Sequence, residues 1–148
     1  MRQKVVVFSQ IDPIILDKLK AKYEVSCIDP KLGEVNAQIL EAVKDADAMI
    51  GAGRLLNEKN LETATRLKII SSVSVGYDNY DVNYLNAQQI WLSNTPHVLT
   101  ETTADLAFSL LMAAPRQVAQ LDAWTKQGHW SRPAGAAQFG QGIFGKTL

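Results

Sequence analysis

Short apolar runs alternate with longer runs in which apolar residues recur at helical spacing up to about residue 94. The first run, residues 5–8, is continuous and rich in β-branched side chains, which is typical of a strand buried on both faces. Asp12 and Pro13 then begin a helix, because aspartate can cap free amides and proline fits the first turn. The pattern predicts strands at residues 5–8, 24–28, 48–50, 68–73 and 90–92, and helices at residues 12–22, 36–44, 58–65 and 82–88.

Strands that alternate with helices imply right-handed crossovers and a parallel sheet with helices on both faces. Because five strands are predicted and no sixth, we expect an α/β fold with a flavodoxin-like order of five parallel strands.

The pattern changes near residue 95, where a long helical stretch over residues 100–127 begins. Its middle is apolar on nearly every side, which predicts burial against several partners, and Pro115 should kink or break it. Residues 131–145 are rich in Gly, Ala and Pro and are typical of a loop, and residues 145–148 look like the start of a new strand. We therefore expect a flavodoxin-like domain at residues 1–99, followed at residues 100–148 by a long helix and loop that lead into a further domain.

Composition excludes several classes of function. The 15 basic residues balance the 15 acidic ones, so no charge excess favours nucleic acid or an anionic membrane. No apolar run approaches the roughly 20 residues that a membrane-spanning helix needs. One cysteine and two histidines predict neither an internal disulfide nor a metal site, and Cys27 is expected to be a small core residue. These features are typical of a cytoplasmic enzyme or binding domain.

The most informative segment is residues 72–81, which leaves the carboxyl end of the fourth predicted strand. Ligands of parallel sheets bind outside such strand ends. Gly76 would permit a turn that directs successive backbone amides outward, forming a nest for an anion such as a carboxylate. An ordinary strand-to-helix turn, with Asp81 as the helix cap, accounts for the same residues equally well.

Several motifs together resemble one family. They are the sequence Ser-Val-Gly-Tyr-Asp-Asn at residues 74–79, Thr-Pro-His-Val-Leu-Thr-Glu-Thr at residues 95–102, Thr-Ala-Asp at residues 103–105, Gly-His-Trp at residues 128–130 and Gly-Lys-Thr-Leu at residues 145–148. In order and spacing the set resembles the D-isomer-specific 2-hydroxyacid dehydrogenases, nearest to the branch of glyoxylate, hydroxypyruvate and 2-ketogluconate reductases. The resemblance covers the whole chain. It implies reduction of a small 2-keto acid to the D-2-hydroxy acid with NAD or NADP, by an enzyme that is expected to be a homodimer.

The resemblance also implies roles for particular residues. The amides of Val75 and Gly76 would bind the substrate carboxylate, with Val75 also beside the nicotinamide, and Thr103 would contact the cofactor. Arg54 and Leu55, in the loop after the third predicted strand, would lie along the substrate tail. Arg54 could equally be a solvated surface residue, and the Thr103 hydroxyl could be buried and bonded to its own helix. The chain departs from the family pattern at Asp105, where glutamate is usual, and at Pro115.

The resemblance implies that the catalytic arginine, glutamate and histidine come from a later, cofactor-binding half, so no catalytic residue is assigned here. His97 and His129 have no partner that the sequence identifies. The sequence Gly-Gln-Gly-Ile-Phe-Gly at residues 140–145 has the dinucleotide-binding spacing, but it neither follows a predicted strand nor begins a predicted helix. We therefore expect a fragment that is inactive alone. The alternative is a non-enzymatic flavodoxin-like module that binds a ligand or regulates a partner.

Overall fold

The computed structural model describes residues 2–147, and the chain divides into two compact units, Met1–Val98 and Leu99–Leu148. The elements of the first unit are β1 (Lys4–Val7), α1 (Pro13–Lys22), β2 (Glu24–Cys27), η1 (Pro30–Leu32), α2 (Val35–Ala42), η2 (Val43–Asp45), β3 (Ala48–Gly51), α3 (Glu58–Leu61), β4 (Ile69–Ser72), α4 (Val82–Ala87) and β5 (Trp91–Ser93). The predicted start of α1 is confirmed, since the Asp12 carboxylate accepts a hydrogen bond from the Ile14 amide at 2.7 Å.

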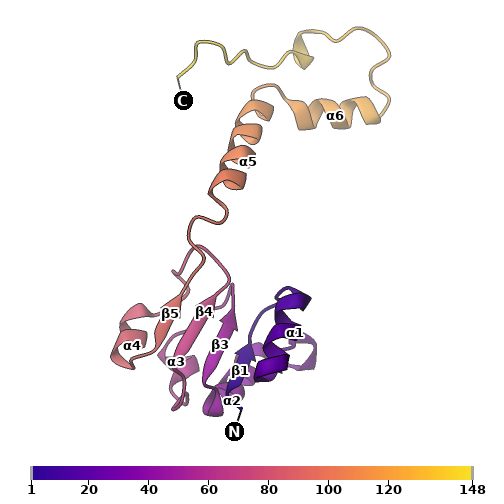
Figure 1. Cartoon of the computed structure of the whole chain (residues 1–148). Coiled ribbons are helices and arrows are strands. Elements are labelled where there is room, and N and C mark those ends of the chain that lie inside the picture. Colours follow the sequence, from indigo (N-terminus) through magenta and orange to yellow (C-terminus); the bar gives the residue numbers. More distant parts are fainter. Residues whose placement is uncertain (1, 148) are drawn as a thin grey trace. The chain divides into compact units, whose positions relative to one another are not determined.

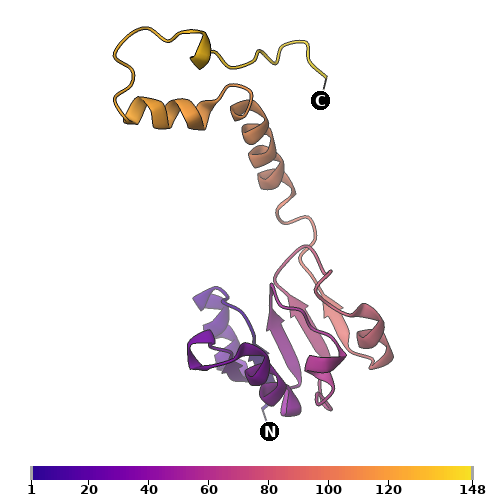
Figure 2. The same cartoon turned by 180° about the vertical axis from the view of Figure 1, so that it is seen from behind.

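The five strands form one parallel sheet in the order β2-β1-β3-β4-β5, which confirms the predicted flavodoxin-like order. The direction of the chain reverses after β2, so right-handed crossovers place α1 on one face and the later helices on the other. Figures 1 and 2 show α1 on one face of the sheet and α2 and α3 on the opposite face.

The main core lies between the sheet and α2, α3 and α4. Its most deeply buried members are Val6, Phe8, Ile39, Val43, Met49, Leu56, Leu61, Ile70 and Leu85. The α1 side of the sheet is covered less completely, because α1 contributes no buried residue and Trp91 on the edge strand β5 is 77% exposed. The sheet is therefore asymmetric, although helices lie on both of its faces.

Three local expectations are corrected. Cys27 is exposed, and its strand β2 lies at the edge of the sheet. The third helix ends at Leu61 instead of Thr65, where the Ala64 amide bonds to the Leu61 carbonyl and tightens the chain into a turn. Residues 145–147 form no strand, because they make no ladder with any described strand; Leu148 lies outside the described residues.

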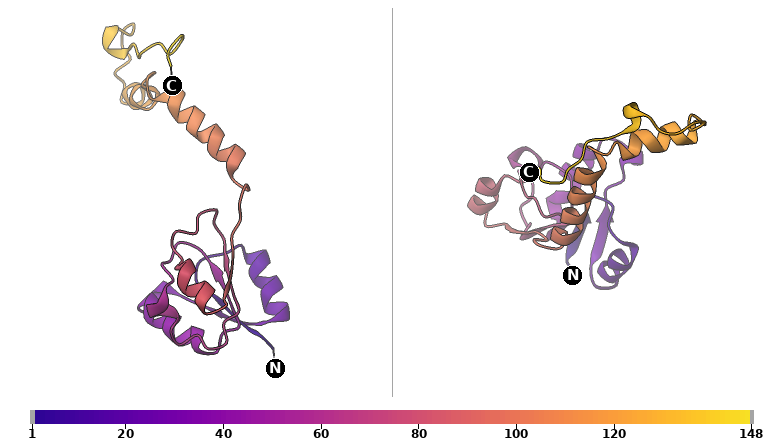
Figure 3. Two further views of the ribbon diagram at one scale, coloured as in Figure 1. Left: turned by 90° about the vertical axis from the view of Figure 1, so that its left-hand side faces the viewer. Right: turned by 90° about the horizontal axis from the view of Figure 1, so that it is seen from above.

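The second unit contains α5 (Thr100–Ala113), α6 (Val118–Lys126) and η3 (Ala136–Gln138). The predicted break at Pro115 is confirmed, and Gln117 completes it by adopting a left-handed conformation with φ of 55° just before α6. Figure 3 shows α5 and α6 as two separate helices joined by this turn. Within residues 2–147, no helix combines the length and the apolar character needed to span a membrane.

Candidate active site

The loops that follow β1, β3, β4 and β5 meet at the carboxyl edge of the sheet, where ligands of such sheets bind. The Ala52 amide donates to the Ser9 hydroxyl at 2.8 Å, which joins the loop after β3 to the loop after β1. The Val73 amide donates to the Gly51 carbonyl at 2.9 Å, which joins β4 to β3 at the same level. The strand ends therefore form one continuous rim.

A second set of hydrogen bonds fixes the loop after β3 against the segment after β4. The Leu56 amide donates to the Asn79 carbonyl at 2.8 Å, and the Asp81 amide donates to the Leu56 carbonyl at 3.0 Å. Leu56 itself is fully buried and anchors this contact in the core. Residues 53–55 and residues 75–77 consequently lie on neighbouring loops of one rim.

The backbone amides of Val75, Gly76 and Tyr77 donate to no group within residues 2–147. All three residues are exposed, so three successive donors are available to an external acceptor. Such a run of unpaired amides at a strand end is suited to an anion, and a carboxylate has the size and charge to accept from two of them.

The conformational role predicted for Gly76 is wrong. Gly76 is not among the glycines with positive φ, and a Cβ atom added there would meet only the Asp78 Oδ2 atom, at 3.6 Å. The residue of this rim that needs glycine for its backbone is Gly53, with φ of 70°. The absence of a side chain at Gly76 therefore matters for what approaches the amides from outside rather than for the turn itself.

The two predicted tail-binding residues follow Gly53 directly. Arg54 is half-buried and makes no ion pair or side-chain hydrogen bond within the described residues, so its guanidinium is free for an anionic or hydroxyl-bearing group. Leu55 is 63% exposed, although the next residue, Leu56, is buried. Both side chains are available at the rim.

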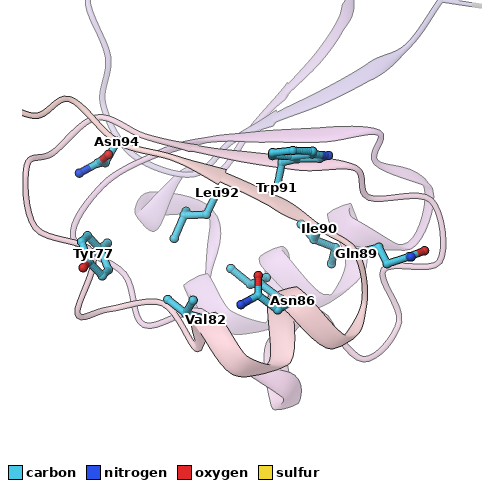
Figure 4. A pocket seen from close by; sticks show the side chains of 9 residues that line it. Tyr77, Val82, Asn86, Gln89, Ile90, Trp91, Leu92 and Asn94 are labelled. Atoms are coloured by element: carbon cyan, nitrogen blue, oxygen red, sulfur yellow. The ribbon is translucent and has the colours of Figure 1, made fainter.

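A cavity of about 760 Å³ adjoins this rim between α4 and β5. Figure 4 shows that Tyr77 and Asn94 lie at one end of it, whereas Gln89 and Trp91 lie toward the other. The Asn94 side chain donates to the Val75 carbonyl at 2.8 Å, so the opposite side of that peptide, with the Gly76 amide, points away from the Asn94 side chain.

Thr103 belongs to the second unit and lies in the first turns of α5. Its side chain is exposed and makes no hydrogen bond within the described residues; the neighbouring Thr102 hydroxyl is the one that bonds back, to the Leu99 carbonyl at 3.2 Å. The alternative that Thr103 is a buried, self-bonded helix threonine is therefore wrong.

The remaining candidates have structural roles or none. His129 bonds to the Gln127 side chain at 3.2 Å and packs near the Trp124 ring, at a centroid distance of 6.4 Å. No cluster of potential metal ligands is found in the part of the chain that the structure describes.

Gly140, the first glycine of the dinucleotide-like motif, packs against the turn at Pro115, whose carbonyl would lie 2.4 Å from an added Cβ atom. Residues 141–147 form no helix, so this glycine serves close packing of the backbone.

Sequence reasoning missed the hydrogen-bonding roles of Ser74 and Asn94. The Ser74 hydroxyl donates to the Gly76 carbonyl at 2.8 Å, and Asn94 holds the Val75 carbonyl as described above. In the sequence these two residues stand out only as parts of longer motifs. A polar residue shortly after each of two neighbouring strands is the signal that could have found them, because parallel strands bring such residues to the same edge.

The fold is a flavodoxin-like α/β domain, and unpaired backbone amides of residues 75–77 lie at the carboxyl edge of its parallel sheet. The family model of the D-isomer specific 2-hydroxyacid dehydrogenase catalytic domain matches residues 5–138, and the chain belongs to this family.

Relatives and solved structures agree with this assignment. The glyoxylate/hydroxypyruvate reductase B of Serratia proteamaculans is 34% identical over 148 residues, which are 100% of this chain and 46% of that protein. The TT0316 protein of Thermus thermophilus matches with a TM-score of 0.80 and 30% identity, over 93% of this chain and 45% of its own. The NADPH-dependent glyoxylate/hydroxypyruvate reductase of Sinorhizobium meliloti, solved with citrate, has a TM-score of 0.77 and 30% identity, over 99% of this chain and 45% of its own. The chain thus spans a little under half the length of these relatives.

Proposed function

We propose that residues 1–148 form the substrate-carboxylate side of an oxidoreductase that reduces a small 2-keto acid, of the glyoxylate, hydroxypyruvate or 2-ketogluconate type, to the D-2-hydroxy acid. The observation that carries this proposal is the run of unpaired, exposed amides at Val75, Gly76 and Tyr77 at the carboxyl edge of the sheet. The names of the similar Serratia and Sinorhizobium proteins, both glyoxylate/hydroxypyruvate reductases, support the substrate class.

In this proposal the amides of Val75 and Gly76 bind the substrate carboxylate and orient the keto carbon. Fixed backbone dipoles need no reorganisation when they bind an anion, so they can place the reacting carbon reproducibly. NAD or NADP, when bound, supplies the hydride. The exposed, unbonded hydroxyl of Thr103 and the exposed backbone at Val75 fit contact with such a cofactor. The acid that protonates the product alkoxide is not assigned to any residue of this chain.

Arg54 and Leu55 would determine how the substrate tail is received. Glyoxylate has no tail, whereas hydroxypyruvate and 2-ketogluconate carry hydroxyl groups that a free guanidinium can bind. The half-buried Arg54, without an acidic partner in the described residues, is available for that contact. On this proposal Arg54 contributes to the preference among 2-keto acids and contributes little to the binding of glyoxylate.

The exposed apolar surface of α5 supports the proposal of a homodimer. Leu106, Phe108 and Leu110 are 59%, 63% and 60% exposed, and α5 has no buried residue within its own unit. Monomeric proteins seldom expose apolar patches larger than a few hundred Å². We therefore propose that other parts of the assembly, including a second subunit, cover this helix. We also propose that the assembly acts in the cytoplasm.

A chimera provides the test. Residues 1–148 would replace the matching segment of the Serratia proteamaculans reductase, and turnover of glyoxylate and hydroxypyruvate would be followed with NADH and NADPH. The proposal predicts turnover that Gly76→Val lowers by at least about tenfold in kcat/KM, because the branched side chain covers the amides while causing no clash closer than 3.6 Å at its Cβ atom. Val73→Ile, at an exposed position of the same loop, is the matched control and should retain turnover. A folded, active chimera whose kcat/KM is unchanged by Gly76→Val would refute the role of the nest.

A further inference from the structure

Three successive backbone carbonyls behind the nest are each held by a hydrogen bond from the unit itself. The Ser74 carbonyl accepts from the Thr95 amide at 3.0 Å. The Val75 carbonyl accepts from the Asn94 side chain at 2.8 Å, and the Gly76 carbonyl accepts from the Ser74 hydroxyl at 2.8 Å. No carbonyl in this short run is left to rotate freely.

Each held carbonyl fixes the direction of the amide in the same peptide unit. A trans peptide is planar, so the carbonyl of one residue and the amide of the next point in opposite directions. The bonds from Thr95 and Asn94 therefore direct the amides of Val75 and Gly76 away from the segment that follows β5. The bond from Ser74 likewise directs the Tyr77 amide away from its own hydroxyl.

The Ser74 hydroxyl is itself positioned by a buried neighbour. Ser72 is only 2% exposed, and its hydroxyl lies 2.7 Å from the Ser74 hydroxyl. A serine hydroxyl carries one proton, and that of Ser74 is donated to the Gly76 carbonyl, so Ser72 is the donor within the pair. A chain of two hydroxyl groups thus runs from the buried end of β4 to the back of the nest.

We propose that Asn94 and Ser74 are positioning residues for carboxylate binding: they hold the peptides of residues 75–77 with their amides outward before the ligand arrives. This inference rests on the proposed function of the nest. Without these bonds a peptide unit can rotate and present its carbonyl oxygen to the carboxylate, which replaces attraction by repulsion. Val75, Gly76 and Tyr77 are exposed, so the surrounding side chains do not otherwise prevent the rotation.

Titration of the chain with oxalate, followed through its backbone amide resonances, tests the proposal. In the unchanged protein the amides of residues 75–77 should shift most. Asn94→Leu preserves the side-chain shape but removes the donor, and Ser74→Ala removes the hydroxyl. Each variant should bind oxalate about three- to tenfold more weakly, which corresponds to the loss of one neutral hydrogen bond. Resonances elsewhere should stay in place.

Two further variants separate positioning from general disturbance of the loop. Ser74→Thr retains the hydroxyl and should restore oxalate affinity to within about twofold of the unchanged protein. Ser93→Ala removes a hydroxyl that bonds to Ser71 at 3.0 Å on the same pair of strands but does not touch the nest, and its affinity should be unchanged.

The outcomes distinguish this inference from the proposed function. Suppose that oxalate shifts the amide resonances of residues 75–77 in the unchanged protein, and that Asn94→Leu and Ser74→Ala bind oxalate as tightly as the unchanged protein does. The nest then stands and the positioning role is overturned. If Ser74→Thr binds as weakly as Ser74→Ala, the role of the hydroxyl is overturned. If oxalate shifts none of these amides in the unchanged protein, the proposed function of the nest and the positioning role are both overturned.

Discussion

Replacement of Asp47 by asparagine tests how the amino-terminal ends of neighbouring strands are held together. The Asp47 carboxylate accepts from the Lys4 amide at 2.9 Å, and one Arg66 nitrogen lies 2.9 and 3.0 Å from its two oxygens. The Asp47 backbone also bonds to the Lys4 carbonyl at 2.9 Å and accepts from the Lys68 amide at 3.0 Å. Asp47 is therefore the point at which the starts of β1, β3 and β4 are joined.

The size of the effect follows from what asparagine retains. It has nearly the same shape and keeps one acceptor oxygen for Lys4, so the variant loses charge rather than packing. A hydrogen bond to a charged group contributes about 1.5–3 kcal/mol, whereas an ion pair with a half-exposed side chain such as Arg66 contributes at most about 1 kcal/mol. Because the Lys4 bond is weakened and not removed, we expect Asp47→Asn to lower the free energy of unfolding by about 1–3 kcal/mol at pH 7.

The same contacts predict how this difference depends on pH. The hydrogen bond from the Lys4 amide, assisted by Arg66, holds the pKa of Asp47 below its ordinary value even though burial raises it. A carboxyl group with a depressed pKa in the folded state contributes stability that is fully present above its unfolded pKa of about 3.9. That contribution is lost as the pH falls through the folded pKa. The difference in the free energy of unfolding between the protein and Asp47→Asn should therefore be constant above about pH 5 and should shrink as the pH falls below about 4.

Urea unfolding of both proteins, followed by far-UV circular dichroism across this pH range, measures the difference. Asp45→Asn is the matched control, because the Asp45 carboxylate pairs with Lys4 at 2.6 Å but is 57% exposed, and its replacement should change stability much less. A loss of stability at pH 7 that does not diminish as the pH is lowered, or no loss at pH 7 at all, would contradict this prediction.

Three further predictions concern other parts of the chain. Gly140→Ala should detach residues 139–141 from the turn at Pro115, because the added Cβ atom would lie 2.4 Å from the Pro115 carbonyl oxygen. The Gln141 amide bonds to that carbonyl at 2.7 Å, so its hydrogen exchange should accelerate by at least about tenfold. Residues 1–148 alone should show no reduction of glyoxylate with NADH or NADPH, and steady turnover by the purified chain, surviving mutation of Thr103, would contradict this. The chain should self-associate through the exposed apolar residues of α5, so light scattering at low micromolar concentration should give a mass above that of a monomer. The double variant Leu106→Ser, Phe108→Ser should have the mass of a monomer. A monomeric unchanged chain would contradict this prediction.

The order of the elements could be predicted because it depends on local periodicity. Each strand is a short apolar run and each helix has its own spacing, so the sheet order follows from the rules of crossover connections. The break at Pro115 is equally local. Burial on a strand is not local: the residues around Cys27 in the sequence do not reveal that β2 lies at the edge of the sheet or that Cys27 is exposed there.

The candidate site was predictable in its place but not in its construction. The segment after β4 could be identified from its position at a strand end and from its resemblance to a family motif. The bonds from Asn94 and Thr95 to that segment depend on the pairing of β5 with β4, which aligns Ser93 with Ser71 and brings residues 94 and 95 beside residues 74 and 75. The sequence suggested a conformational reason for glycine at position 76, whereas the backbone angle shows that conformation does not require it.

A crystal structure of the chain with glyoxylate or oxalate would show whether the amides of residues 75–77 bind a carboxylate. We expect a carboxylate whose oxygens lie within about 3 Å of the Val75 and Gly76 backbone nitrogens, a distance typical of N–H···O hydrogen bonds. We also expect the Asn94 side chain to keep its bond to the Val75 carbonyl in the complex. A carboxylate bound instead in the cavity between α4 and β5, with the amides of residues 75–77 left without an acceptor, would show that these amides are not the carboxylate site.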